Sequence, residues 1–457
     1  MATLIEQKPL YNTLPVGQDI IFAISNTGIV STKPRVKFIA EVHISSTNPA
    51  NQNTSTDLIG TFKTTPNNAG VGIFDLSSVV ESYVKADNTS GIFGAYKGTL
   101  VTSLTQDIIP PIHLIDKFSV NSNIIRWLTV RFKIEYYDDT TNAMVVSSQD
   151  TDSEDYKIFN GYLKHTDSLD MLSSDFGYSM TNFQLGDSNK RFLTNASVTQ
   201  YANIEDYGTV ALLDPNNKIE YVKFNYLNVL GASIGSDDVA SGFAISSLAK
   251  LQILYLGCFP ANLRNWSSTF QALVTADTIK NYTVQAFDDT DTAVSKVYTI
   301  NINCPDLKNY ESIRLAWLNQ WGAWDYYTFT KKSVRSLSTK GSTYTQQSGT
   351  WNEAKYRPKG FKGGMKSFRV NATEKIKMNT DFVNETESEW FEELINSPEV
   401  YVLEGYQSDT PYPLLNTYVT PVRLLTSSYI RKTIANDRLM QFTFEVEKSK
   451  TLRTQAV

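Results

Sequence analysis

The sequence predicts a mainly β protein, with several antiparallel β-sandwich domains and a C-terminal β-rich module that contains one short helix. Three observations support this fold class. The 457 residues include 25 Tyr and 23 Phe, a composition that favours strands. Apolar and polar residues alternate along many short segments, as they do when one face of a sheet is buried. Segments rich in Ser, Thr and Asn separate these runs, and the length suits about two to four domains.

The N-terminal elements follow from these patterns. Alternation predicts strands within residues 20–24, 36–44 and 127–134. One short helix is expected between the second and third of these. Asp75 is its candidate N-cap, and the apolar residues within 76–84 recur with helical spacing.

Two similar hairpins predict two related sandwich domains. Residues 132–140 and 282–290, which lie 150 positions apart, each run from a strand into an Asp-Asp-Thr turn. Each resembles the terminal hairpin of an immunoglobulin- or fibronectin-like sandwich, and Tyr282 is a candidate tyrosine corner. The alternative, that any two β-hairpins look this similar, stays open. The predicted domains are residues 1–170 and 171–305.

Residues 306–457 are the predicted C-terminal module. Its helix begins with a capping box in which Thr386 is the N-cap and Glu389 the third helical residue. Pro398 follows the expected end of the helix at Asn396. Alternation then predicts strands within residues 400–403 and 440–446.

An aromatic run stands out within this module. Residues 317–329 contain three tryptophans and three other aromatic residues. Gly322 interrupts the alternation and can adopt a positive φ, so we expect a β-hairpin that turns at residues 319–322. Such aromatic density predicts burial, in an intrachain core or at a contact between copies.

The same run carries a family resemblance. It is similar to the W-L-N-x-x-G-A-W-D-Y-x-T-F signature of virion proteins of tailed bacteriophages, especially phages of Bacteroidota, crAss-like phages included. Shorter segments resemble the same group: residues 14–22, 74–83, 191–195 and 397–401. The resemblance implies a structural subunit of the tail or of the portal-to-tail connector. Such a subunit is expected to form a homo-oligomeric ring around the genome channel, or a hub like that of distal tail proteins.

The resemblance also implies location and partners. We expect the protein in the tail or neck of a virion, assembled in the cytoplasm of a host bacterium. Its implied partners are copies of itself, neighbouring tail or portal proteins, and DNA passing through a lumen without sequence specificity.

Charge is unevenly distributed near the C-terminus. Residues 331–377 contain twelve basic and two acidic residues, whereas residues 381–404 contain eight acidic residues and no basic one. We expect residues 341–349, rich in Gly, Ser and Gln, to protrude as a loop. Three interpretations stay open: the charges neutralise each other within one fold, they meet across copies in a ring, or the basic stretch faces DNA. The candidate interface residues are Trp317, Trp321, Trp324, Tyr326, Lys355, Arg357, Lys359, Lys362, Lys366, Glu389, Glu392 and Glu393.

Other patterns argue against catalysis. Residues 231–235 match the G-x-S-x-G motif, but a predicted loop follows and all three histidines precede it. No histidine pair has metal-binding spacing, and two cysteines cannot build a disulfide framework. The acidic residues within 150–155 and 288–291 suit surface loops or, alternatively, calcium. We therefore expect no enzyme activity, no catalytic residue, no cofactor and no metal.

Composition bounds the remaining alternatives. The net charge of −5 excludes a globally basic nucleic-acid binder. The sequence contains no apolar span of about 20 residues, so no membrane-spanning segment is expected. The main alternative function is a carbohydrate-binding β-sandwich protein, an adhesin or glycan-binding module, whose surface tryptophans stack on sugars. A β-sandwich glycosidase is a third hypothesis, for which no carboxylate spacing can be identified.

Overall fold

The computed structural model confirms a mainly β protein, with 47% of the described residues in strands and 13% in helices. It describes the following residues: 3–46, 57–85, 91–94, 100–101, 112–121, 125–148, 150–163, 182–214, 218–240, 253–303, 310–350, 352–404, 418–428, 430 and 440–453.

The chain divides into two compact units, each built from segments distant in sequence. Unit 1 comprises Met1–Cys304, Leu318–Tyr326 and Gly405–Asn416, and unit 2 comprises Pro305–Trp317, Tyr327–Glu404 and Thr417–Val457. The predicted domain boundaries after residues 170 and 305 fall outside the described residues. The division into three domains therefore stays a prediction.

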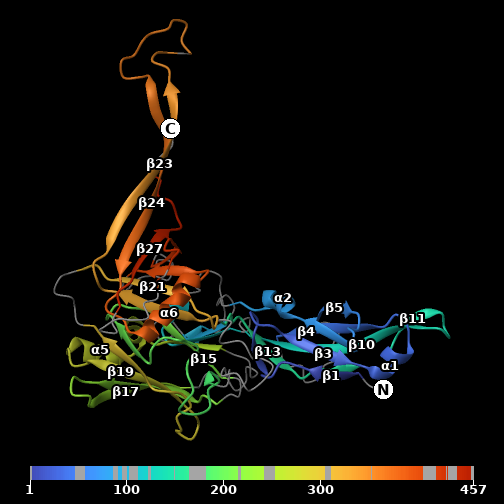
Figure 1. Cartoon of the computed structure of the whole chain (residues 1–457). Helices are drawn as coiled ribbons and strands as arrows, with labels where there is room; N and C mark the ends of the chain where they lie inside the picture. Colours follow the sequence, from blue (N-terminus) through green and yellow to red (C-terminus); the bar gives the residue numbers. More distant parts are fainter. Residues whose placement is uncertain are drawn as a thin grey trace. The chain divides into compact units, whose positions relative to one another are not determined.

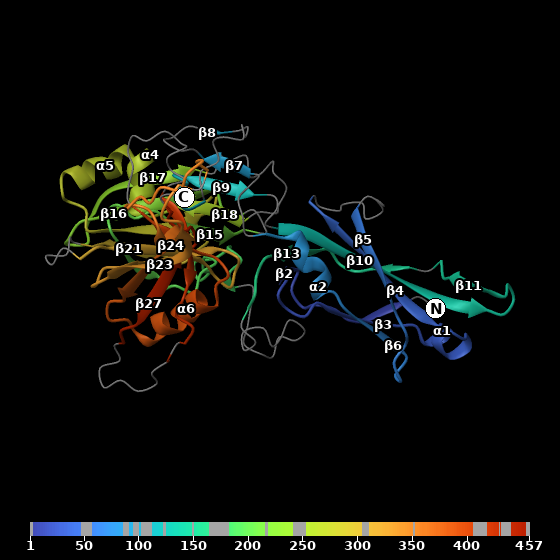
Figure 2. The same ribbon diagram turned by 90° about the horizontal axis from the view of Figure 1, so that it is seen from above.

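The N-terminal part of unit 1 contains a three-stranded and a seven-stranded sheet (Figures 1 and 2). The small sheet has the order β1 (Leu4–Gln7), β3 (Ile21–Ser25), β6 (Val71–Asp75). The large sheet has the order β2 (Thr13–Pro15), β13 (Tyr156–Phe159), β10 (Ile125–Asp138), β4 (Lys37–Ser45), β5 (Leu58–Thr64), with β11 (Ala143–Val146) and β12 (Thr151–Asp152) also paired to β10. Helix α1 (Thr27–Thr32) follows β3.

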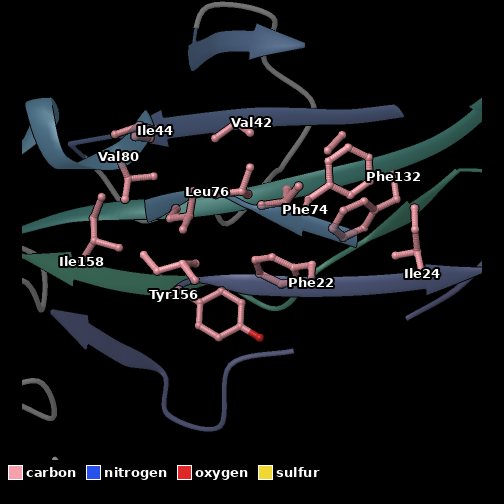
Figure 3. Close-up of a cluster of buried hydrophobic side chains, with 14 of the residues drawn as sticks. Phe22, Ile24, Val42, Ile44, Phe74, Leu76, Val80, Phe132, Tyr156 and Ile158 are labelled. Atoms are coloured by element: carbon pink, nitrogen blue, oxygen red, sulfur yellow. The ribbon is translucent and has the colours of Figure 1, made fainter. Parts of the chain in front are cut away.

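Alternating residues of these strands form one apolar core (Figure 3). The ring of Phe22 lies 5.5 Å from that of Phe132 and 5.7 Å from that of Tyr156, between centroids. Phe74 joins the same cluster from β6. The period-two pattern of the sequence therefore identified the buried face correctly.

The short helix expected after Asp75 is present but irregular. It consists of α2 (Ser77–Val80), continued by the 3-10 helix η2 (Glu81–Tyr83). Its N-cap residue is Leu76, not the predicted Asp75. The Asp75 carboxylate, one residue earlier, accepts hydrogen bonds from the backbone N and the Oγ of Ser77, at 3.0 and 2.8 Å. Leu76 and Val80 point into the core cluster, as their spacing predicted.

Unit 1 also contains two five-stranded sheets. One has the order β14 (Thr199–Ala202), β20 (Tyr298–Ile302), β19 (Asn281–Phe287), β16 (Tyr221–Leu227), β17 (Ser233–Ala240). The other has the order β15 (Thr209–Leu213), β18 (Ile253–Gly257), β9 (Phe118–Asn121), β7 (Gly91–Gly94), β8 (Leu100–Val101). In the second sheet β9, which follows the 3-10 helix η4 (Ile112–Leu114), pairs with β18, more than 130 residues later in the chain. The predicted division along the sequence did not include this pairing.

Both predicted Asp-Asp-Thr turns connect paired segments. Asp138 of β10 pairs with Ala143 of β11, and Phe287 of β19 bridges to Ala293. Tyr282, however, does not form a tyrosine corner. Its hydroxyl donates a 2.7 Å hydrogen bond to the carbonyl of Cys258, 24 residues upstream, which is farther than a corner reaches.

Besides α1, two helices of unit 1 were not expected. They are α4 (Pro260–Trp266) and α5 (Ser268–Thr275). Pro260 stands in the first turn of α4, where its missing N–H costs nothing. Ser267 caps α5 by accepting a 2.8 Å hydrogen bond from the backbone N of Phe270. Both helices are too short for their periodicity to stand out.

Unit 2 contains a seven-stranded sheet. The first residues of its edge strand β22 belong to unit 1. Its order is β22 (Trp324–Phe329), β21 (Ile313–Leu318), β25 (Val400–Leu403), β26 (Val419–Leu424), β27 (Thr443–Lys448), β24 (Gly364–Asn379), β23 (Val334–Gln346). Helix α6 (Glu385–Asn396) contributes Phe391 to the core, whose ring centroid lies 5.5 Å from that of Phe444.

The helix of unit 2 ends at Asn396 as predicted, but its cap differs. Asn384, not Thr386, is the N-cap residue. The Asn384 Oδ1 accepts a 2.8 Å hydrogen bond from the backbone N of Glu387, and the Glu387 carboxylate accepts a 3.0 Å bond from the backbone N of Asn384. This reciprocal pair starts the helix two residues earlier and places Thr386 inside the first turn.

Candidate functional site

The aromatic run is part of the intrachain core. Trp317, Trp321, Trp324 and Tyr326 are all buried by the chain itself. Of the two predicted kinds of burial, the structure therefore has the intrachain one. Their side chains do not lie on the surface of the chain, and their role as interface residues stays a prediction.

The turn of this hairpin has the predicted geometry. Gly322 has a φ of 68°, and the Asn319 Oδ1 accepts hydrogen bonds from the backbone N of Trp321 and of Ala323, both at 3.0 Å. A Cβ at Gly322 would lie 1.8 Å from the carbonyl oxygen of Asn160. Glycine is therefore required here both for its conformation and for space.

The titratable residues of the run make structural contacts. The Thr194 hydroxyl donates a 2.7 Å hydrogen bond to Asp325, and the Arg314 Nη1 donates a 2.8 Å bond to the Thr328 hydroxyl. The Tyr326 hydroxyl lies 2.9 Å from the Nδ1 of buried His113. These polar atoms are satisfied inside the fold, as buried polar groups must be.

The candidate site is instead a long hairpin arm, defined as residues 334–379. Its strands, β23 and β24, contain 13 and 16 residues and pair along the whole length of β23. Figure 1 shows them running far beyond the other strands of their sheet. The neighbouring strand β27 pairs only with residues 375–379, and Leu452 bridges to Ala372. Among the described residues, the ribbon is thus two-stranded beyond Ala372.

This arrangement corrects the prediction for residues 341–349. Residues 341–346 belong to β23, where Gly341 pairs with Val370, and the protruding loop is residues 347–363. Contacts within the loop stabilise it: the backbone N of Lys359 donates a 2.9 Å hydrogen bond to the carbonyl of Ser348, and the Tyr356 ring covers Gly349. Trp351 lies outside the described residues.

The register places three apolar side chains and the basic side chains of the arm on opposite faces. Residues paired across an antiparallel ribbon share a face, and successive residues alternate. Leu337 is therefore on the same face as Val370 and Met365, which pair with Gly341 and Thr345. We call these three residues the apolar face; they are 60%, 41% and 76% exposed, respectively.

The opposite face carries the cations. Lys340 is in line with Ser342, which pairs with Arg369, and with Tyr344, which pairs with Lys366. We call Lys340, Lys366 and Arg369 the basic face. A bulge at Phe368 interrupts the register, and its ring lies 6.5 Å from that of Tyr344, so both rings belong to the basic face as well.

Two cations near the base of the arm, Lys331 and Arg335, are paired with carboxylates within the fold. Arg335 forms ion pairs with Glu311 and, at 2.7 Å, with Glu374; its hydrogen bonds with Glu311 raise its pKa. Burial acts to raise the pKa of Glu374, but hydrogen bonds from Arg335 and Lys448 outweigh it and hold that pKa below its ordinary value. Lys331 pairs with Asp381 at 2.9 Å. Intrachain neutralisation, the first of the three interpretations, therefore applies to these two cations.

The outer arm, residues 340–371, is different. It contains seven basic residues and a single acidic one, Glu353, whose carboxylate lies 4.0 Å from Arg357. Within the described part of the chain, no carboxylate lies within ion-pair distance of the other six. These six are Lys340, Lys355, Lys359, Lys362, Lys366 and Arg369.

The acidic block of the sequence is dispersed in the structure. Glu389 is exposed and Glu392 half-buried on α6, whereas Glu393 is buried. Glu387 caps the helix, and Glu404 lies 3.5 Å from Lys448. Glu393 therefore faces the interior, and the interface role of the other two candidates stays a prediction.

The acidic loops of unit 1 are occupied by intrachain contacts. Asp152 pairs with Arg131 at 2.7 Å, and Glu154 pairs with Lys8. Asp288 accepts hydrogen bonds from the backbone N atoms of Thr290 and Thr292. Among the described residues, no group of three or more His, Cys, Asp or Glu is placed to hold a metal ion. No helix in the described part of the chain is long and apolar enough to cross a membrane.

Comparison with known proteins gives no further assignment. No protein-family model matches the chain, and no curated protein matches it.

The separation of charge on the arm was not predicted from the sequence, because it depends on the cross-strand register of residues more than 20 positions apart. The surface most suited to a partner is thus the arm.

Proposed function

We propose that the protein is a structural subunit that assembles with copies of itself. Following the resemblance of its aromatic hairpin, we place it in the tail or portal-to-tail connector of a bacteriophage virion. The observation that carries the assembly proposal is the arm, a ribbon exposed on both faces that presents Leu337, Met365 and Val370 to solvent.

A ribbon of this kind is poorly stabilised alone. An isolated two-stranded hairpin is at best marginally stable in water, and an exposed apolar strand invites pairing with another chain. A partner that covers the apolar face removes both problems. Fully burying side chains of this size contributes about 1.5–3 kcal/mol each, so covering the exposed parts of three contributes on the order of 3 kcal/mol.

Charge favours a second copy as this partner. The outer arm has a net charge of +6, from seven basic residues and one acidic residue, while the whole chain carries −5. The rest of each copy is therefore strongly acidic and attracts the arm of its neighbour. Because the arm and its acceptor are different surfaces, the contact is head-to-tail and can close into a ring.

The carbohydrate-binding alternative has lost its main support. It depended on tryptophans exposed on a strand, and Trp317, Trp321 and Trp324 are buried. Their faces are covered by the chain itself and cannot stack on a sugar from solvent.

Sedimentation velocity over a range of protein concentrations tests the proposal. Replacing the three residues of the apolar face with Ser should weaken association roughly a hundredfold, which corresponds to the loss of about 3 kcal/mol. A matched control changes three threonines of the same face to Ser: Thr339, Thr343 and Thr345. A wild-type chain that stays monomeric at high concentration, or two variants that associate equally, would overturn the proposal.

A further inference from the structure

We propose that the basic face and the tip of the arm bind the phosphodiester backbone of a nucleic-acid duplex, without sequence preference. This surface is distinct from the apolar face, and the inference does not depend on assembly. It rests on the cross-strand register, which gathers cations from both strands onto one side of the ribbon.

The cations of the outer arm form an extended array. Lys340, Lys366 and Arg369 occupy one face, and Lys355, Arg357, Lys359 and Lys362 follow in the tip. All are exposed except Lys359, which is half-buried. At about 3.4 Å per residue, Lys366 and Arg369 are roughly 10 Å apart along their strand, so the array spans several phosphates of a duplex.

The neighbours of these cations suit phosphate contacts. Ser338, Ser342, Asn371 and Thr373 alternate onto the same face by the register. Hydroxyl and amide side chains of this kind commonly donate hydrogen bonds to phosphate oxygens alongside Lys and Arg. The face therefore offers both charge and hydrogen-bond donors, whereas Glu353, the single acidic residue in the sequence of the outer arm, lies in the tip beside Arg357.

The dimensions of the ribbon also suit a duplex. Two strands about 4.8 Å apart, with their side chains, form a ribbon roughly 10 Å wide. The major groove of B-DNA is about 12 Å wide and admits a two-stranded β-ribbon. The outer arm is two-stranded beyond Ala372, so no third strand of the described chain widens it there.

An acidic protein surface fits the basic face less well. Protein interfaces have apolar centres with polar rims, and lysine is depleted in them. On this arm Leu337, Met365 and Val370 lie on the face opposite the cations, whereas the rings of Tyr344 and Phe368 lie among the cations, and five of the seven outer cations are lysines. This separation assigns the protein contact to the apolar face and leaves the basic face for a polyanion.

Fluorescence anisotropy with the full-length protein and a labelled DNA duplex of mixed sequence tests the inference. Up to seven phosphate contacts should make affinity fall about 10³- to 10⁴-fold between about 50 and 200 mM salt. Changing Lys340, Lys366 and Arg369 to Gln should weaken binding and reduce the slope of log affinity against log salt by about three. Exchanging the same residues as Lys340→Arg, Lys366→Arg and Arg369→Lys keeps the charge and should keep the slope.

Several outcomes would overturn the inference. These are an absence of binding at the lowest salt, or equal slopes for the Gln variant and the charge-preserving variant. Displacement of the duplex by poly-glutamate as efficiently as by unlabelled duplex would assign the face to an acidic protein. Equal or tighter binding to a single strand would contradict the duplex. Measurement at concentrations where the protein is monomeric separates these results from a failure to assemble.

Discussion

Replacing Gly322 with Ala should destabilise unit 1 by more than backbone strain alone explains. Three glycines of this unit allow the causes to be separated. Gly186 has open space for a Cβ and an ordinary φ, and Gly231 has open space but a φ of 77°. Gly322 has a φ of 68°, and a Cβ added there would lie 1.8 Å from the Asn160 carbonyl oxygen.

The expected magnitudes differ in the same order. Gly186→Ala should be neutral or stabilise by about 0.4–1 kcal/mol, through a lower entropy of the unfolded chain. Gly231→Ala should cost about 1–2 kcal/mol, because Ala is strained at positive φ. Gly322→Ala must also displace backbone. The turn then loses the 2.7 Å hydrogen bond from the Tyr162 N to the Gln320 carbonyl and the contacts of Asn319, so about 3–5 kcal/mol is expected.

Hydrogen exchange measured by mass spectrometry in increasing urea is the suitable assay, because two units need not unfold together. The midpoint for peptides of unit 1 should fall most for Gly322→Ala and least for Gly186→Ala, with an unchanged dependence on urea. Equal midpoints for Gly322→Ala and Gly231→Ala would refute the argument that the Asn160 carbonyl excludes a Cβ.

Three further expectations concern unit 2. Asn384→Ala should cost about 1 kcal/mol by removing the cap of α6, while Thr386→Ala should change stability far less, as thermal melts of the two variants would show. Trp317→Ala should cost about 3–5 kcal/mol, because the side chain is buried 4.9 Å from the ring of Trp390; a melting temperature equal to that of the wild type would contradict this. Reversing the charge of three tip cations should impair salt-sensitive assembly, checked by light scattering, and leave the monomer folded; assembly that tolerates the change would exclude these cations from the contact between copies. The three substitutions are Lys355→Glu, Arg357→Glu and Lys359→Glu.

Local patterns predicted the features that depend on neighbouring residues. Alternation identified the buried faces of β4 and β10, and Gly322 marked the hairpin turn. The cap of α6 shows the limit of such patterns. The spacing from Asn384 to Glu387 and from Thr386 to Glu389 satisfies the same motif, so the sequence alone does not decide between them.

Features that depend on distant pairing were not predictable. Residues 341–346 have the composition of a loop, yet pairing with β24 makes them a strand, since tertiary context overrides weak propensity. The pairing of β9 with β18 joins segments more than 130 residues apart and has no local signal. The two faces of the arm depend in addition on the bulge at Phe368, which reverses the alternation of β24.

The membership of Leu318–Tyr326 in unit 1 has a consequence for synthesis on the ribosome. Unit 1 lacks these residues until translation has passed them, although most of its sheets have by then emerged. Until that point two contacts of the hairpin tip cannot form. In the folded protein the side-chain amide of Asn319 donates a hydrogen bond to the Leu193 carbonyl, and the ring centroid of Trp321 lies 4.0 Å from that of Phe183. In a nascent chain that ends at residue 304, Phe183 and the Leu193 carbonyl therefore lack these partners. The folding of unit 1 is completed only after the first strand of unit 2 has been made.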